Sequence, residues 1–480
     1  MGLTIAEKIL AAHAGADHVT PGQYLWCKVD ATSGHRLADL EALGVDQVWD
    51  PEKVFLVDDH QAPPPTISAA NNVKELRRLI KKYGITNYFE YGRGGILHQV
   101  FAENGMYAPG DLVAQVDSHS TAGGVFNACV TNANLDSVHV LAFGELWFRV
   151  PESVRVILVG TLPAWCVGKD VILKVASELG TDFGLYRSVE YVGPVASQMS
   201  LAQRWTVSNM GVEVGAKFAL FEADEKTDAF LADRVKRPYE HITADSDASY
   251  EAEYEFDLSD LTPMVARPGD PGNGVSIEGV KGERVKVDQA FLGSCTNARL
   301  EDLEVAARIL KGKQVHPDVR MLVSPSSQEV FGEALKAGYL ETLVEAGALV
   351  EHSTCGPCYG GHLGVLGDGE TCISSSNRNF RGRMGSPLAE VWLSSPATVA
   401  ASAIAGEIVD PRDYLSRSGR EQNYGNRSYR SCLEIWRSHQ YRLHDAWPSS
   451  AGQSRPYSRG SSAILYGDQQ TGVGDRRSAR

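Results

Sequence analysis

QAFLGSCTNARLEDLEVAARILKG, residues 289–312, is the stretch that decides the fold class. It opens with a short apolar run typical of a buried strand, and its second half places apolar side chains at helical spacing. The turn GSCTN lies between the two, so a strand ends in a loop from which a helix begins. Strand-like runs recur at residues 54–57, 154–160 and 320–325, with helical patterns between them. This alternation predicts an α/β fold of layered sheets and helices.

The composition restricts the class of protein. With 480 residues the chain is long enough for two to four domains, and 43% hydrophobic and 22% charged residues are typical of a globular protein. No apolar run approaches the roughly 20 residues that span a bilayer, and the N-terminal segment lacks a signal-peptide core, so we expect a cytoplasmic protein. The net charge of −14 disfavours nonspecific nucleic-acid binding but allows a small anionic substrate held by a few arginines.

Two stretches differ in composition from the rest. Residues 261–285 are rich in proline and glycine and are predicted to be a linker. Residues 416–480 contain 11 arginines, no lysine and five acids, with little hydrophobic periodicity. We predict that this basic tail is disordered or non-native sequence, and we place no chemistry in it.

The cysteines indicate a metal site. Eight in a chain of this length are too few for a disulfide scaffold. Cys355 and Cys358 are two residues apart in TCGPC, while Cys295 lies near a helix N-terminus, whose dipole favours a thiolate. Three thiolates without a fourth are compatible with an iron–sulfur cluster that keeps one iron open, although zinc binding or plain packing also explains an isolated Cys-x-x-Cys. The remaining cysteines before the tail are expected to be packing residues: Cys27, Cys129, Cys166 and Cys372.

With these motifs the sequence resembles the aconitase superfamily, and within it the large subunits of two-subunit enzymes, 3-isopropylmalate dehydratase and homoaconitase. GSCTN at 293–297, TCGPC at 354–358 and SSNRNFRGRMG at 375–385 stand in the order found in that family. The resemblance runs from about residue 20 to Leu415, which is nearly all of the chain before the basic tail.

The resemblance implies an architecture and a cofactor. The expected fold has three α/β domains, at residues 1–152, 153–268 and 269–415, and lacks the swivel domain of aconitases. The resemblance also implies that a [4Fe-4S] cluster with one open iron is bound by three ligands, Cys295, Cys355 and Cys358.

Pairs of a carboxylate and an imidazole form the expected acid–base groups. A carboxylate can fix the tautomer of a neighbouring imidazole and raise its basicity, which helps to protonate a departing hydroxyl. An isolated Asp-His pair is more often a surface contact, so the catalytic assignment comes from the resemblance. It implies that pairs in VDDHQ and VDSHST surround the substrate hydroxyl, and that His98 pairs with Glu213. The catalytic residues implied are Asp59, His60, His98, Asp117, His119 and Glu213.

The substrate is expected to be a di-acid. Arg378 and Arg383 lie five residues apart in a glycine-containing loop, and guanidinium groups bind planar carboxylates in a bidentate fashion. The substrate-binding residues that the resemblance implies are Asp30, Thr32, Asn209, Asn297, Asn377, Arg378 and Arg383.

The reaction implied is that of a hydro-lyase that moves the hydroxyl of a 2-hydroxy di-acid by dehydration and rehydration, with the conversion of 2-isopropylmalate to 3-isopropylmalate in leucine biosynthesis as the first expectation. In the family a serine on the swivel domain removes the carbon-bound proton. We therefore expect a separate small subunit, a hetero-oligomer, and no activity from this chain alone. The alternatives are homoaconitase or a dimethylmalate-type dehydratase, an RNA-binding iron sensor, and an electron-transfer protein with four ligands to its cluster.

Overall fold

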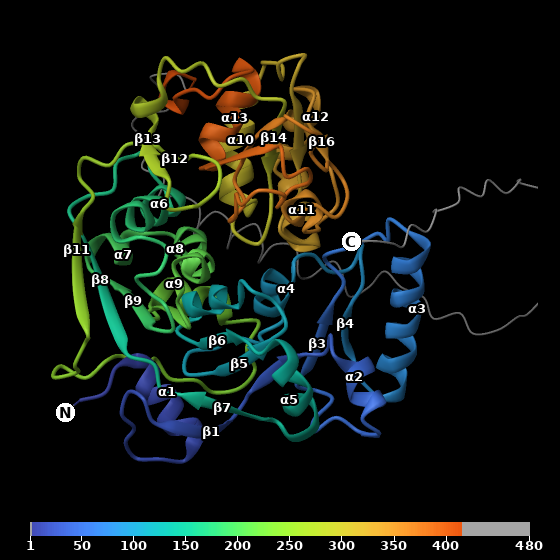
Figure 1. Ribbon diagram of the computed structural model, residues 1–480, viewed down its shortest axis with the longest axis vertical. Coiled ribbons are helices and arrows are strands. Elements are labelled where there is room, and N and C mark those ends of the chain that lie inside the picture. Colours follow the sequence, from blue (N-terminus) through green and yellow to red (C-terminus); the bar gives the residue numbers. More distant parts are fainter. Residues whose placement is uncertain (1, 415–480) are drawn as a thin grey trace, which may run out of the picture. The chain divides into compact units, whose positions relative to one another are not determined.

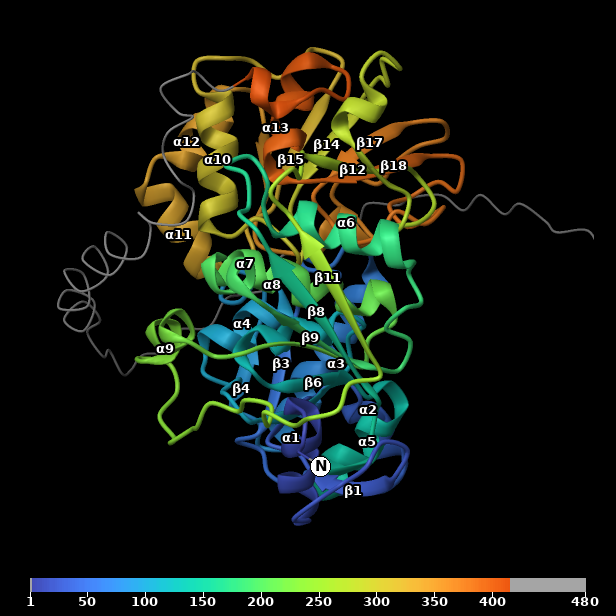
Figure 2. The same ribbon diagram turned by 90° about the vertical axis from the view of Figure 1, so that its left-hand side faces the viewer.

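Three largely parallel sheets and the helices between them make up the computed structural model, which describes residues 2–414 (Figure 1). The predicted α/β fold is confirmed. Figures 1 and 2 both place the third sheet at the top of the view and the first part of the chain at the bottom. The predicted disordered tail at 416–480 lies outside the described residues.

The first sheet is fully parallel, so its loops at the carboxyl ends of the strands share one edge. In spatial order its strands are β4 (Asn87–Phe89), β3 (Val54–Val57), β2 (Ala31–Ser33), β5 (Leu112–Gln115) and β6 (Cys129–Asn132). The chain runs from β2 outward to β4 and then returns to the other side of β2. The strand order therefore reverses between β2 and β5, and such a reversal leaves a crevice at the carboxyl ends.

Helices cover both faces of this sheet, as the burial of strand β3 shows. All four residues of VFLV are buried, as expected for a parallel strand that is packed on both faces. The helices of this part of the chain are α1 (Ile5–Ala14), α2 (Leu37–Ala42), α3 (Ile67–Lys82), α4 (Leu97–Glu103) and α5 (Ser137–Phe143). A small antiparallel sheet of β1 (Tyr24–Lys28) and β7 (Glu145–Arg149) lies at the bottom of Figure 1.

The second sheet is also parallel and has four strands. In spatial order they are β10 (Phe218–Phe221), β9 (Ser188–Val192), β8 (Ser153–Val159) and β11 (Ala252–Asp257). Its helices are α6 (Gly168–Leu179), α7 (Pro194–Gln198), α8 (Leu201–Asn209) and α9 (Glu225–Leu231). Helix α8 is buried along almost its whole length, because it lies between the first sheet and the third.

The third sheet has seven strands. In spatial order they are β13 (Gly274–Ser276), β12 (Met264–Ala266), β18 (Glu390–Ser394), β17 (Thr371–Ser374), β14 (Gln289–Leu292), β15 (Arg320–Val323) and β16 (Leu349–Val350). The strands from β18 to β16 are parallel, and the order reverses between β14 and β17. Its helices are α10 (Leu300–Leu310), α11 (Gln328–Lys336), α12 (Tyr339–Glu345) and α13 (Pro396–Ala405).

The predicted linker at 261–285 is wrong. Strand β12 pairs antiparallel with β18 and with β13, so this stretch supplies two strands to the third sheet. Each of the three larger sheets draws its strands from one continuous part of the chain, and the described residues belong to one compact unit. The boundaries proposed at 152 and 268 remain predictions.

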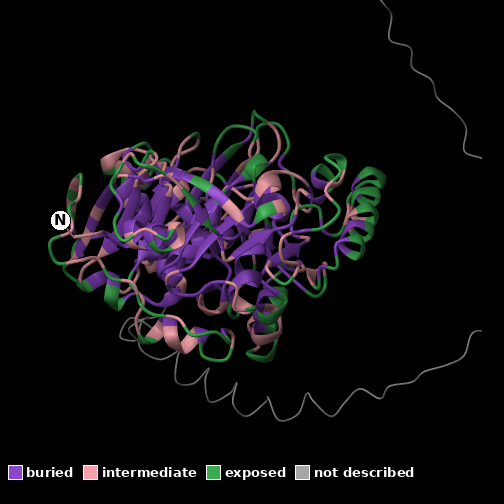
Figure 3. Cartoon of the chain, turned by 90° about the horizontal axis from the view of Figure 1, so that it is seen from below, coloured by how far each residue is buried: buried purple, intermediate pink, exposed green. Residues whose placement is uncertain are grey.

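Buried residues concentrate in the sheets and inner helices, and the outermost helices are exposed on one side (Figure 3). Cys27, Cys129, Cys166 and Cys372 are buried, as predicted for packing residues. Within residues 2–414, none of the helices combines the length and the apolar character that crossing a bilayer would require.

The short 3-10 helix η1 (Ser120–Phe126) follows β5 and packs tightly on β10. A Cβ atom on Gly124 would lie 1.8 Å from the carbonyl oxygen of Ala219, which is backbone and cannot turn away. We expect Gly124→Ala to lower the free energy of unfolding by about 1–3 kcal/mol, as measured by urea denaturation. The control is Gly332→Ala in α11, where no atom lies within 4 Å and a gain of about 0.5–1 kcal/mol is expected. Equal stability of the two variants would contradict this account.

Candidate active site

Three cysteine side chains from two loops of the third sheet line one cavity. Cys295 follows β14, whereas Cys355 and Cys358 follow β16 in and beside the 3-10 helix η5 (Gly356–Tyr359). All three are buried. Asn377, which follows β17, lies between two of them: its Nδ2 is 3.1 Å from Cys295 Sγ and its Oδ1 is 3.7 Å from Cys358 Sγ. The structure therefore brings together the three predicted ligands and one predicted asparagine.

The backbone of the GSCTN turn is held in an unusual conformation. Ser294 and Ala298 have φ values of 84° and 71°, a left-handed region that residues with a side chain adopt at a cost. The guanidinium of Arg299 compensates by donating to the carbonyl oxygens of Cys295 at 2.9 Å and Thr296 at 2.8 Å. This buried arginine thereby keeps the Cys295 side chain directed into the cavity.

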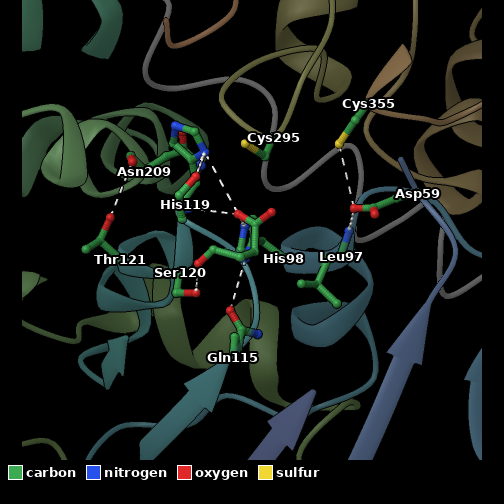
Figure 4. Close-up of polar contacts among 12 residues, drawn as sticks. Asp59, Leu97, His98, Gln115, His119, Ser120, Thr121, Asn209, Cys295 and Cys355 are labelled. Carbon is green, nitrogen blue, oxygen red and sulfur yellow. Dashed lines mark hydrogen bonds and ion pairs between the residues drawn. The ribbon is translucent and has the colours of Figure 1, made fainter. Parts of the chain in front are cut away.

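A buried carboxylate joins the first sheet to the cysteines (Figure 4). Asp59, just after β3, accepts from the backbone N–H of Leu97 at 2.9 Å, and the same oxygen lies 3.7 Å from Cys355 Sγ. Its other oxygen is 2.6 Å from Nδ1 of His60, so the expected Asp59–His60 pair is present. The second nitrogen of His60 faces Asp117 at 3.8 Å.

The remaining imidazole pairs differ from the expectation. His98 Nε2 is 2.9 Å from Asp117 Oδ1, and its Nδ1 is 3.2 Å from Gln115. The predicted pairing of His98 with Glu213 is wrong, because Glu213 lies 2.7 Å from Nε2 of His119 instead. Asp117 accepts the backbone N–H of His119 at 2.8 Å, while the His119 ring is 3.9 Å away.

Both predicted arginines approach the same cavity. Nε of Arg378 is 2.6 Å from Glu213 Oε1, and its Nη1 donates to Ser118 Oγ at 2.9 Å. Arg383 lines the cavity, with Nη2 4.0 Å from Cys358 Sγ. Arg383 therefore stands where an anionic ligand of the cavity would meet it, and Arg378 reaches the edge of the cavity through Ser118.

Burial and neighbouring charges separate the pKa values of two imidazoles. Burial lowers the pKa of His60, but the charge and hydrogen bond of Asp59 outweigh it and raise that pKa to about 9. Burial lowers the pKa of His119 below its usual value, although Glu213 opposes the shift. One imidazole thus favours the protonated form and the other the neutral form, which is a useful pair for acid and base chemistry.

The cysteine group has the chemistry of a site for a thiophilic metal. Burial raises the pKa of Cys295 to about 12 and that of Cys355 well above its usual value, so these thiols lose their protons when a cation binds them. A buried amide donor without a hydrogen-bond partner, Nδ2 of Asn209, lies at the end of α8. Asn297 is also buried, and its Nδ2 donates to Asp302 at 3.2 Å. An iron–sulfur group held by three thiolates fits these residues, since its sulfide ions can accept hydrogen bonds.

The structure does not bring Asp30 and Thr32 to this cavity. Asp30 directly precedes β2, at the end of the strand opposite the catalytic loops, where it pairs with His13 at 2.7 Å and accepts from the N–H of Leu112 at 2.9 Å. Thr32 is buried within β2 itself. Their expected contact with substrate finds no support in this placement. Asn209 is near the cysteines, with its Oδ1 3.3 Å from Asn377.

Three other residues line the cavity but were not predicted from the sequence. Tyr359 directly follows Cys358, and its ring lies 5.0 Å from that of His60. Ile96 and Ser118 also line the cavity, next in sequence to predicted segments. Adjacency to a motif was the only feature that could have identified them.

Comparisons with known proteins found relatives along most of the chain. The model of the Aconitase family (aconitate hydratase) matches residues 7–406. The 3-isopropylmalate dehydratase large subunit of Caldanaerobacter subterraneus subsp. tengcongensis is 45% identical over 420 residues, covering 86% of this chain and 100% of that protein. The 3-isopropylmalate dehydratase large subunit 1 of Methanopyrus kandleri is 46% identical over 422 residues, covering 86% of this chain and 100% of that protein. The solved structure of Thermococcus kodakaraensis aconitase X has a TM-score of 0.45 and 13% identity, covering 80% of this chain and 92% of that chain.

The raised pKa of His60 makes a testable contribution to stability. Its value of about 9 in the folded chain exceeds the 6.5 of a free imidazole, so the stabilisation is fully present below pH 6.5 and is lost as the pH rises to 9. In urea unfolding of the metal-free chain, the stability advantage over His60→Gln should fall across this range. Solvent screening reduces its size, because 45% of the side chain is exposed. The decrease in this stability difference between pH 6.5 and 9 should be smaller in an Asp59→Asn background. A stability difference that grows with pH would contradict the raised pKa of His60.

Proposed function

Because the chain belongs to the aconitase family, we propose that it is the large subunit of a hydro-lyase that converts 2-isopropylmalate to 3-isopropylmalate in leucine biosynthesis. Curated relatives that are 44–46% identical over 86% of the chain are named 3-isopropylmalate dehydratase large subunit. The observation that carries the proposal is a single cavity that three cysteines, imidazole–carboxylate pairs and an arginine line together. The metal ligands, a proton donor and a carboxylate-binding arginine are then within reach of one small di-acid.

Membership in the aconitase family implies an iron–sulfur cluster. We propose a [4Fe-4S] cluster held by Cys295, Cys355 and Cys358, with the fourth iron open. When bound, the cluster supplies a Lewis acid that polarises the substrate hydroxyl and a carboxylate. Asn377 donates to Cys295 Sγ and thereby helps to fix the sulfur that it contacts.

The residues of this chain act as an acid and as holders of the substrate. His60, kept protonated by Asp59, gives its proton to the hydroxyl as the carbon–oxygen bond breaks, and water leaves. General acid catalysis of this kind contributes about 10²–10⁴ in rate. Arg383 and Arg378 bind the carboxylates and align the hydroxyl with the proton donor. Rehydration at the neighbouring carbon is the reverse of these steps, with His60 taking a proton from water.

The group that removes the carbon-bound proton is assigned to a partner. The relatives are named large subunits, which implies a small subunit. We propose that the small subunit is a swivel domain that covers the cavity and supplies this base and part of the substrate selectivity. A reducing cytoplasm would keep the three thiols available for the cluster.

A reconstitution assay tests the proposed reaction. The chain is loaded anaerobically with iron and sulfide and mixed with a small subunit of an isopropylmalate dehydratase. We expect turnover of 2-isopropylmalate, followed by the absorbance of the unsaturated di-acid, and none from either subunit alone. Homocitrate and 2,3-dimethylmalate serve as competing substrates. Full turnover by this chain alone, or a higher kcat/KM for either competitor, would overturn the assignment.

Cysteine variants test the ligand set. Cys295→Ala, Cys355→Ala and Cys358→Ala should each retain less than about a tenth of the wild-type iron and sulfide after anaerobic desalting, because two thiolates hold the cluster far less tightly than three. The matched control is Cys372→Ala, which removes a buried thiol of β17 that does not line the cavity. It should keep its iron and sulfide. Full retention in any of the three test variants would remove that residue from the ligand set.

A further inference from the structure

Lys169 is a fully buried cation near the cysteines. It lies in the first turn of α6, and its relative exposure is 0%. Its Nζ donates to the carbonyl oxygens of Ser375 at 2.8 Å and Ser376 at 2.7 Å. Among residues 2–414, no carboxylate oxygen lies within the 4.0 Å of an ion pair with this ammonium.

A buried ammonium without a counter-ion is costly. Two carbonyl groups solvate the charge but do not neutralise it, and unpaired buried charges usually destabilise the fold. Burial lowers the pKa of Lys169 to about 7, and the groups that oppose the shift are Asp302, then Cys295, Cys358 and Asp170. Within residues 2–414, no carboxylate pairs directly with this charge.

The carboxylate of Asp302 is already engaged. It accepts the backbone N–H of Arg299 at 3.1 Å and the amide of Asn297 at 3.2 Å, and so caps α10. Asp170 is engaged in the same way, because it accepts the backbone N–H groups of Val167 at 2.9 Å and Met264 at 2.7 Å. The sulfurs of Cys295 and Cys358 become thiolates when they bind a metal, and Arg383 lies on the cavity side of them, with its Nη2 4.0 Å from Cys358 Sγ. They are the negative groups that remain for Lys169.

The lysine is also joined to these sulfurs through the backbone. Ser375 and Ser376 directly precede Asn377, whose amide spans Cys295 and Cys358. Lys169 thus fixes, from a helix of the second sheet, the loop that aligns two sulfurs in the third.

We propose that Lys169 is the counter-charge of the iron–sulfur group bound by Cys295, Cys355 and Cys358, and that it sets the reduction potential of that group. The inference rests on the cluster site of the proposed function. Lys169 is a positioning residue and does not touch the substrate. Its ammonium favours the more negative, reduced form of the cluster, because a nearby positive charge in a buried site stabilises added electrons.

The test separates the charge from the hydrogen bonds. Lys169→Gln keeps an N–H donor for the two carbonyl groups but removes the charge, and Lys169→Met removes both. The matched control is Lys174→Gln, which removes a charge from the same helix at a partly exposed side chain that pairs with Glu178. Reduction potentials are measured on the anaerobically reconstituted full chain by redox titration, with the cluster followed by EPR.

We expect Lys169→Gln and Lys169→Met to raise the ratio of oxidised to reduced cluster about tenfold at a fixed potential, which is 59 mV toward negative values for one electron. Lys174→Gln should match the wild type. An unchanged potential in Lys169→Gln overturns the proposal, and a shift in Lys169→Met alone means that only the hydrogen bonds matter, which overturns it as well.

If the Lys169 variants do not hold a cluster, Co²⁺ titration of the metal-free chains decides. Thiolate-to-cobalt absorption should show about tenfold weaker binding in Lys169→Gln than in Lys174→Gln, and equal binding overturns the proposal. The two hypotheses fail separately. A wild-type chain that assembles no cluster contradicts the proposed function, whereas a normal cluster with the same potential in Lys169→Gln contradicts only the role of Lys169.

Discussion

Asp59 holds together the two halves of the cavity, and the rest of the site depends on it. Its backbone carbonyl accepts from the N–H of Cys355 at 2.8 Å and from the hydroxyl of Thr354 at 2.7 Å, which ties the end of β3 to the TCGPC loop. Its side chain binds His60 and the first N–H of α4. One residue therefore fixes the proton donor, a helix start and a cysteine loop relative to each other.

This junction follows from the way the two sheets face each other. The carboxyl ends of parallel strands carry loops whose N–H groups and side chains are free to bind ligands. Here the loops after β3 and β5 bring acids and imidazoles, and those after β14, β16 and β17 bring sulfurs and an asparagine. Neither sheet alone offers both a proton donor and a metal site, so the chemistry depends on their packing.

The sequence predicted the groups that are local to a strand and its following loop. Three cysteines near strand ends and Asp59 beside His60 could be identified, because their geometry follows from adjacency. The partner of His98 could not, because it depends on how α4 and β5 pack around Asp117. Asp30 lies away from the cavity for a different reason. It precedes β2, and only the other end of that strand faces the cavity.

The proline and glycine content of residues 261–285 led to the wrong prediction of a linker. Strand β12 in this stretch pairs with β18, which lies more than a hundred residues further along the chain. Lys169 gave no local signal at all, because a lysine in the first turn of an amphipathic helix is normally a solvated surface residue. Its burial arises only when α6 packs against the loop that follows β17. Long-range packing thus decided the features that the sequence could not reveal.

The charges in the cavity are sorted by sheet, and this sorting orients an anionic ligand. The carboxylates Asp59 and Asp117 belong to the first sheet, and imidazoles already form hydrogen bonds with them. The guanidinium of Arg383 belongs to the third sheet and lies beside a cysteine sulfur. A di-acid is therefore drawn by its carboxylates toward the arginines and the metal ligands, which leaves its hydroxyl facing His60. The same asymmetry makes a cation buried behind the cysteines favourable, since thiolates and substrate carboxylates both add negative charge on that side.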